Sequence, residues 1–150
     1  MSLKEDLERS LHTAMKEKND LRKNALRMAL SSIKLAEIDS GKALDDSMTF
    51  SILQKEIKTK EETIAEAEKA NRPEMISPIR SEIEILKEYL PKEMTEEELN
   101  ALVKKTVSDL KATTIKEMGM VMKSVIQEAH GKASNDRISK AVRDLLSNNP

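Results

Sequence analysis

The sequence predicts an all-α protein with a four-helix N-terminal unit, residues 1–91, and a small three-helix C-terminal unit, residues 92–150. Apolar residues recur at intervals of three and four positions along most of the chain, which is the period of an amphipathic helix. The 150 residues include only three glycines and four prolines, whereas a β protein needs a turn signal about every 8–12 residues. Charged residues make up 35% of the chain and apolar residues 38%, so we expect long solvated helix faces around a thin core.

The first two helices are predicted from regularly spaced leucines and from turn residues. Leu3, Leu7 and Leu11 begin an amphipathic helix, which Asn19 interrupts. The second helix has a wide apolar face, and this width predicts a central position in its unit. Gly41 is the signal that ends this helix, because glycine readily adopts the left-handed backbone of a helix C-terminus.

The third and fourth helices carry polar residues and prolines at informative positions. Asp45 is suited to cap the third helix, and Lys60 occupies a position where its apolar stripe would call for an apolar side chain. Asn71-Arg72-Pro73 is predicted to start the fourth helix, and Pro78 to kink it or delay its start. Pro91 marks the predicted break between the two units.

The C-terminal unit contains two capping boxes. Thr95 and Thr114 each precede a glutamate by three residues, so hydroxyl and carboxylate can satisfy backbone N–H groups reciprocally at a helix start. Gly131 is predicted to end the second helix of this unit and Asn135 to cap the third.

The residue types present exclude several classes of function. The chain has no cysteine, so it has no disulfide framework and no thiolate metal site. Its aromatic residues are Phe50 and Tyr89, too few for the platform on which single-strand RNA modules stack bases. The first 20 residues lack an apolar signal-peptide core, and no segment approaches the roughly 20 apolar residues of a membrane span. These features predict a cytoplasmic soluble protein without a membrane partner.

No combination of side chains predicts catalysis, a cofactor or a metal site. The sequence lacks a glycine-rich phosphate loop, and none of its glycines adjoins a serine with a candidate base. His12 is interpreted as a helix-surface residue, and His130 as a residue that closes a helix, with phosphate contact as the competing interpretation. Glu82, Glu84 and Glu88 are expected to form a solvated acidic face, because they lack the Glu-x-x-His pairs of a di-metal bundle.

Three methionines lie close together in the C-terminal unit. Met118 and Met122 share one helix face and are predicted to join the core. Met120 lies nearly opposite and is predicted to be exposed, which leaves a methionine-rich partner groove as an alternative.

The last third of the chain is basic. Residues 1–100 carry a net charge of −5 and residues 101–150 a net charge of +4. Lys116 and Lys123 are seven residues apart and are expected to share a helix face, and basic residues around the Gly131 turn could converge with them. A scattered set of solvated lysines is the alternative interpretation. The candidate nucleic-acid-binding residues are Lys116, Lys123, Lys132, Arg137, Lys140 and Arg143.

Local motifs in a fixed order carry a resemblance to a known family. The motifs are Tyr89-Leu90-Pro91 at a helix end, Met118-Gly119-x-Val121-Met122 inside a later helix, and Gly131-Lys132-Ala133 at the next turn. Arg27 precedes them in the second helix, and Asn71-Arg72 opens the fourth. Together they resemble the YqeY family, which is similar to the C-terminal tail of GatB, a subunit of the tRNA-dependent amidotransferase.

The resemblance extends over residues 2–147 and implies an all-α protein of two helical parts. It also implies a tRNA-binding or amidotransferase-associated accessory protein, because in the amidotransferase the tail contacts tRNA while other parts perform the chemistry. At family level this corresponds to carbon–nitrogen ligase activity with glutamine as amido-nitrogen donor, but no intrinsic activity is expected of this chain. A protein–protein adaptor that uses a helical groove is the alternative. The oligomeric state is left open.

Overall fold

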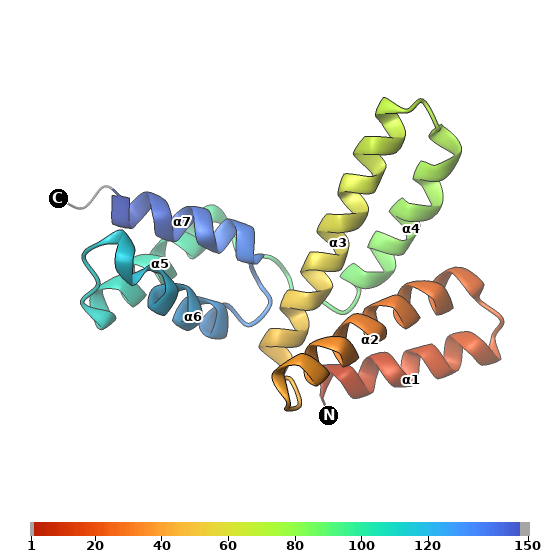
Figure 1. The fold of residues 1–150 in the computed structure, drawn as a ribbon, viewed down its shortest axis with the longest axis horizontal. Helices are drawn as coiled ribbons and strands as arrows, with labels where there is room; N and C mark the ends of the chain where they lie inside the picture. Colours follow the sequence, from red (N-terminus) through yellow and green to blue (C-terminus); the bar gives the residue numbers. More distant parts are fainter. Residues whose placement is uncertain (1, 148–150) are drawn as a thin grey trace. The chain divides into compact units, whose positions relative to one another are not determined.

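The computed structural model describes residues 2–147, and these residues form helices and connecting turns without a strand (Figure 1). The chain divides into two units, Met1–Leu90 and Pro91–Pro150. The helices of the first unit are α1 (Leu3–Lys16), α2 (Asp20–Ser40), α3 (Asp46–Lys69), the short 3-10 helix η1 (Pro73–Met75) and α4 (Ile76–Lys87). Those of the second unit are α5 (Glu96–Leu110), the 3-10 helix η2 (Ile115–Glu117), α6 (Met118–Ala129) and α7 (Asn135–Ser147). The all-α prediction is confirmed, with four and three α-helices among the described residues.

Polar side chains fix the starts of the first three helices. The Ser2 hydroxyl accepts a hydrogen bond from the Glu5 backbone N–H at 3.2 Å, and Asn19 Oδ1 accepts one from Arg22 at 3.1 Å. Asp45 caps α3 in the same way, as predicted. Each contact satisfies a backbone donor that has no partner inside its helix. Gly41 ends α2 with a φ of 75°, in the left-handed region that favours glycine.

The start of the fourth helix differs in detail from the prediction. Pro73 opens the 3-10 helix η1, and the α-helix itself begins at Ile76. Pro78 therefore lies in the first turn of α4, where its missing N–H removes no intrahelical hydrogen bond. The predicted delay is thus a short 3-10 segment before the α-helix.

The core of the first unit joins two helical hairpins. Figure 1 shows α1 beside α2 and α3 beside α4, and α2 also packs against α3 and α4, which gives it the central position predicted from its wide apolar face. Burial of these side chains is the main force that holds the hairpins together. The core residues are Leu3, Leu7, Leu26, Ala29, Ile33, Phe50, Leu53, Ile57, Ile64, Ile83 and Leu86.

The predicted solvated face of Glu82, Glu84 and Glu88, on α4 and at its C-cap, is only partly present. Glu82 accepts a hydrogen bond from the Lys60 ammonium group at 2.7 Å, and Lys60 is buried on the apolar side of α3. Glu88 binds both terminal nitrogens of the Arg22 guanidinium, at 2.7 and 3.1 Å. Glu84 remains exposed. Glu88 is also exposed, so the prediction of a solvated side chain is confirmed for Glu84 and Glu88. It was wrong for Glu82, because Lys60 on α3 faces it only in the folded unit.

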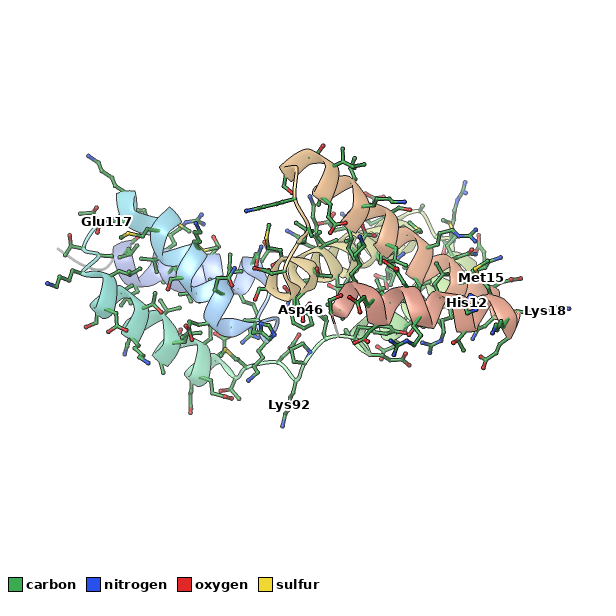
Figure 2. All side chains as sticks on the ribbon, turned by 90° about the horizontal axis from the view of Figure 1, so that it is seen from below. His12, Met15, Lys18, Asp46, Lys92 and Glu117 are labelled. Carbon is green, nitrogen blue, oxygen red and sulfur yellow. The ribbon has the colours of Figure 1, made fainter. Side chains whose placement is uncertain are left out.

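Glu37 joins α2 to two other segments of the first unit. One of its oxygens accepts from the Lys4 ammonium group at 2.6 Å, and the other accepts from the Leu44 backbone N–H at 3.1 Å. Near this site, the Leu3 backbone N–H donates to Asp46 Oδ1 at 3.0 Å, and Figure 2 shows Asp46 beside the start of α1. These contacts connect α1, α2 and the start of α3.

The Glu37 contacts predict a pH dependence of stability. The Lys4 hydrogen bond, followed by the Leu44 hydrogen bond, holds the pKa of Glu37 below its ordinary value of 4.5. Because the folded state binds the ionised form better, the stabilisation is present above that ordinary pKa and is lost as the pH falls through the lowered value. We expect Glu37→Gln to make the midpoint of urea unfolding less sensitive to pH below about 4.5. An unchanged acid profile would show that Glu37 does not contribute.

The second unit begins with the first predicted capping box. Glu98 N–H donates to the Thr95 hydroxyl at 3.1 Å, and Thr95 N–H donates to the Glu98 carboxylate at 3.2 Å. The α6 helix ends at His130, with a φ of 45°, and Gly131 follows with a φ of 84°. Two consecutive left-handed residues turn the chain sharply into α7, and glycine tolerates this backbone at little cost.

Candidate nucleic-acid interface

The helices of the second unit bury their apolar sides against one another. Because α5, α6 and α7 contact one another pairwise, the basic residues between the apolar positions are left at the surface. The core residues are Leu99, Val103, Val107, Ala112, Val121, Val125, Ala129, Ala133, Ile138, Val142 and Leu146.

Five of the six candidate nucleic-acid-binding side chains are exposed. Lys116 lies in η2, Lys123 in α6 and Lys132 in the turn after α6, while Lys140 and Arg143 lie on α7. Within residues 2–147 none of these five forms an ion pair, so their charges are free to meet an external anion. We call these five side chains the basic set.

The basic set is extended. Lys116 precedes α6 and Lys132 follows it, so the whole of this 12-residue helix lies between them, and its length is about 18 Å at 1.5 Å per residue. Lys123 lies between them, and α7 packs against both α6 and η2. An array of this length suits successive phosphates of a nucleic-acid backbone better than a single small anion.

Carboxylates lie among these cations. Asp136 and Asp144 are each four residues from Lys140 and share its side of α7. The pKa of Glu98 is lowered mainly by its hydrogen bonds to Thr95, and the positive charge of Lys132 also contributes. The folded unit includes the acidic start of α5, so residues 91–150 hold ten basic and nine acidic residues, a net charge of +1. Its field is therefore weaker than the +4 of residues 101–150 suggests.

Arg137 has a structural contact that the sequence did not reveal. Its guanidinium donates to the Met94 carbonyl at 2.9 Å and to the Glu96 carboxylate at 3.1 Å. The Met94 N–H in turn donates to the Lys132 carbonyl at 2.7 Å. Arg137 and the Lys132 turn thus hold the segment before α5 against the start of α7. We therefore omit Arg137 from the basic set.

This contact predicts a local loss of stability in Arg137→Ala. The substitution removes a charge-assisted hydrogen bond from a carbonyl, which costs about 1 kcal/mol at a partly exposed site. Amide hydrogen exchange of α7, measured by NMR, is expected to become roughly fivefold faster. Arg143→Ala, on the same helix but exposed, serves as the control and should leave exchange unchanged. Equal effects of the two substitutions would argue against the contact.

The predicted position of Lys116 was wrong. Lys116 lies in η2, outside α6, so it does not share an α-helix face with Lys123. Its segment is fixed by Glu117, labelled in Figure 2, whose carboxylate accepts from the Thr113 and Thr114 backbone N–H groups at 3.0 and 3.2 Å. These hydrogen bonds lower the pKa of Glu117.

The cap of α7 also differs from the prediction. The Ser134 hydroxyl accepts from the Arg137 backbone N–H at 3.2 Å, and the Ser134 carbonyl accepts from Ile138. Ser134 is therefore the N-cap, and Asn135 is the first residue of the helix. Sequence alone could not separate these neighbours, because both types are good caps.

The methionines follow the predicted division. Met118 and Met122 are partly buried against the core of the second unit. Met120 is 48% exposed, and Ile115, the first residue of η2, is 47% exposed. Gly119 lies beside Met120, with open space around the position a side chain would take.

The histidines and carboxylates show no metal site in the part of the chain that is described. His12 is exposed on α1, where Figure 2 shows it near Met15, and His130 is exposed at the end of α6. Residues 2–147 contain no group of three or more His, Cys, Asp or Glu side chains placed to hold a metal ion. None of the described helices is long and apolar enough to cross a membrane.

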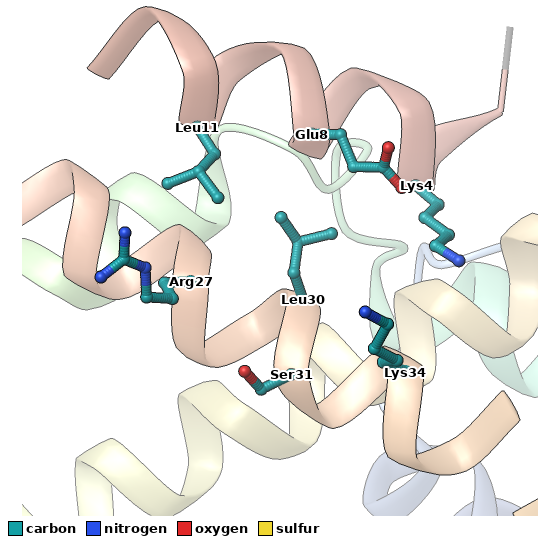
Figure 3. A pocket seen from close by; sticks show the side chains of 7 residues that line it. All are labelled: Lys4, Glu8, Leu11, Arg27, Leu30, Ser31 and Lys34. Atoms are coloured by element: carbon teal, nitrogen blue, oxygen red, sulfur yellow. The ribbon is translucent and has the colours of Figure 1, made fainter. Parts of the chain in front are cut away.

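The first unit contains a pocket that the sequence analysis missed. It has a volume of about 320 Å³ and lies between α1 and α2. Figure 3 shows Leu11 and Leu30 pointing toward one another across it, with charged side chains around them. The seven-residue spacing of Arg27 and Lys34 was a possible signal, but the pocket exists only once α1 packs beside α2. The full lining is Lys4, Glu8, Leu11, Arg27, Leu30, Ser31 and Lys34.

Comparison with known proteins identifies the family. A family model described as Yqey-like protein matches residues 4–146, almost the whole chain. The chain belongs to the YqeY-like family. The resemblance drawn from the motifs is therefore confirmed.

Curated relatives of this YqeY-like chain come from fungi. Altered inheritance of mitochondria protein 41, mitochondrial, of Lachancea thermotolerans is 38% identical over 109 residues, which cover 71% of this chain and 58% of the relative. The protein of the same name from Kluyveromyces lactis is 38% identical over 114 residues, covering 73% and 59%. That from Pyrenophora tritici-repentis is 27% identical over 143 residues, covering 93% and 78%. The matches thus span less than two thirds of the length of the first two relatives.

The relatives correct the predicted location of the YqeY-like chain. All four are named as mitochondrial proteins, so the cytoplasmic prediction is wrong. The prediction rested on the absence of an apolar signal-peptide core. Mitochondrial targeting segments are amphipathic and arginine-rich, so that test could not detect them.

Proposed function

We propose that this YqeY-like protein is a non-catalytic tRNA-binding accessory protein whose second unit contacts the phosphate backbone through the basic set. The observation that carries the proposal is the distribution of five exposed, unpaired cations over about 18 Å of surface around α6 and α7. Family membership supports it through the similarity between YqeY proteins and the GatB tail. This similarity also makes association with an amidotransferase part of the proposal.

The chemistry of the unit favours recognition of backbone charge and shape over recognition of bases. Its described residues 91–147 contain no Phe, Tyr or Trp side chain on which a base could stack, and a single histidine, His130, does not make a stacking platform. Lysine ammonium groups bind phosphate oxygens as point charges and carry no base information. We therefore expect binding to a folded RNA with little preference for sequence, and with the steep salt dependence of counterion release.

The proposal is tested by titrating the full chain with bulk tRNA at two salt concentrations. The test variant changes Lys116, Lys123, Lys132 and Lys140 to alanine. The five phosphate contacts of the basic set predict a roughly 500-fold loss of wild-type affinity between about 50 and 200 mM salt. The variant keeps only Arg143 of this set, so it should lose most of the affinity and most of this slope. The control variant removes the same charge from exposed lysines of the first unit: Lys16, Lys42, Lys55 and Lys69.

The control variant is expected to bind tRNA like the wild type. Equal weakening by both variants would mean that binding depends on the net charge of the protein and not on the basic set, which would contradict the proposal. Absence of binding at low salt would also overturn it. An amide-transfer assay with this protein as the sole enzyme addresses catalysis separately. We expect no turnover, because the chemistry in the proposed assembly belongs to other subunits.

A further inference from the structure

The outer face of α2 carries large apolar side chains outside the core of the first unit. Met28, Leu35 and Ile38 are 52%, 60% and 71% exposed, and Leu21 is 36% exposed. Leu21, Met28 and Leu35 are spaced by seven residues, so they form a row along one side of the helix. We call these three residues the α2 apolar row. Ile38, three residues after Leu35, lies about 60° around the helix from it, on the side of Arg27 and Lys34. Large apolar side chains that are exposed in a row, and not scattered singly, mark an interaction site.

A row of cations runs beside the α2 apolar row. Arg27 and Lys34 each immediately precede a member of that row, which places the cations about 100° further around the helix. Both side chains are exposed, and neither forms an ion pair within residues 2–147. Asn24 and Ser31 lie between the two rows and are also exposed, so small polar residues separate them.

The pocket between α1 and α2 lies on the cationic side of this face. Its lining includes Arg27, Ser31 and Lys34, and its volume of about 320 Å³ can admit a side chain from outside. Lys4, also in the lining, is already held by Glu37 at 2.6 Å. Figure 3 shows Arg27 and Lys34 on α2 at the two ends of the pocket, with Leu30 between them. Incoming carboxylates would thus find a cation without an internal partner at each end of the pocket, and Glu8 is the only acidic side chain in its lining.

We propose that this face of α2 binds an amphipathic helix of a partner protein, with the partner's apolar stripe on the α2 apolar row and a row of acidic side chains along Arg27 and Lys34. Docking of one apolar helix face in a groove is a common recognition mode, and complementary charges fix its orientation. This inference goes beyond the proposed tRNA binding, because it concerns a different unit and a different partner.

The same charges argue against the other occupants of this face. An antiparallel second copy of α2 would bring the cationic rows against each other, and a parallel copy would set each cationic row against an apolar row. RNA would match Arg27 and Lys34 but would leave the α2 apolar row without a partner. An acidic amphipathic helix satisfies both rows.

The experiment uses two synthetic helical peptides of about three heptads that share a leucine stripe. One peptide carries glutamates along one edge of the stripe, and the other carries lysines at the same positions. Fluorescence anisotropy with the full chain is expected to show binding of the glutamate peptide and at least tenfold weaker binding of the lysine peptide. Leu35→Glu should weaken binding of the glutamate peptide at least tenfold.

Charge reversal provides the decisive comparison. The double variant Arg27→Glu, Lys34→Glu should now prefer the lysine peptide, whereas the control Lys55→Glu, Lys69→Glu, with the same charge change on α3, should keep the wild-type preference. Both control lysines are exposed, so neither pair of substitutions should disturb the core. A preference unaffected by the Arg27 and Lys34 reversal, or no binding of either peptide, would overturn the proposal.

Two further readouts separate the remaining occupants. Analytical ultracentrifugation of the wild type is expected to show no dimer. A dimer that the substitution Leu35→Glu dissociates would assign the face to a second copy of the chain and contradict the inference. The Leu35→Glu variant should bind tRNA as the wild type does, because the two sites are independent. If the wild type does not bind tRNA, the helix-docking inference still stands, and if no peptide binds, the tRNA proposal still stands. Loss of tRNA binding in Leu35→Glu would assign the face to RNA and contradict the inference.

Discussion

Glu82→Ala is expected to lower the free energy of unfolding of the first unit by about 3 kcal/mol. The substitution leaves the Lys60 ammonium group, whose side chain is only 9% exposed, without the carboxylate that binds it at 2.7 Å. A cation taken out of water without a partner is strongly destabilising. Urea denaturation followed through Tyr89, the only tyrosine and a residue of this unit, reports the change.

The double variant Lys60→Met, Glu82→Leu distinguishes the lost partner from lost packing. It replaces both charges with apolar groups of similar length, so we expect stability within about 1 kcal/mol of the wild type or above it. If the single and double variants were equally destabilised, the buried charge would not be the cause. Glu84→Ala, a change at an exposed position of the same helix, should have little effect.

Leu26→Ala is expected to destabilise the first unit by about 2–5 kcal/mol, whereas Leu35→Ala on the same helix should change stability by less than about 0.5 kcal/mol. Leu26 is fully buried where α2 meets the core, and its truncation leaves a cavity. Leu35 is 60% exposed and contributes no core packing. Urea denaturation of both variants, followed through Tyr89, tests the contrast.

This contrast also bears on the inferred docking face. A near-neutral Leu35→Ala would show that the α2 apolar row is not maintained for the stability of the isolated chain. A cost similar to that of Leu26→Ala would mean that Leu35 packs within the protein, and the docking proposal would lose its basis.

Local patterns were sufficient for the helices and for most of their ends. Helix periodicity, Asp45, Gly41 and the Thr95 capping box depend on contacts within a few residues of the chain, so the sequence determines them. Errors arose where neighbouring residues compete for one local role, as Ser134 and Asn135 do at the start of α7. The Pro73 region was misjudged for a similar reason, since 3-10 and α turns begin alike.

The candidate interface could be predicted only in part. The alternative interpretation of solvated cations agrees with the exposure of Lys123, Lys140 and Arg143, which lie between apolar positions of helices, and of Lys132 in the turn after α6. The sequence could not show that Arg137 reaches the Met94 carbonyl, which is 43 residues away in the chain. Contacts of this separation depend on how α5 and α7 pack.

The sequence by itself determined that this protein is helical, which side of each helix is apolar, and to which family it belongs. Only the tertiary structure decided which charged residues are partners, as with Lys60 and Glu82 or Arg22 and Glu88. It also decided that Arg27 and Lys34 line a pocket beside an apolar row. The physical reason is that helix formation follows from interactions over three or four residues, whereas charge pairing and cavities depend on the packing of separate helices.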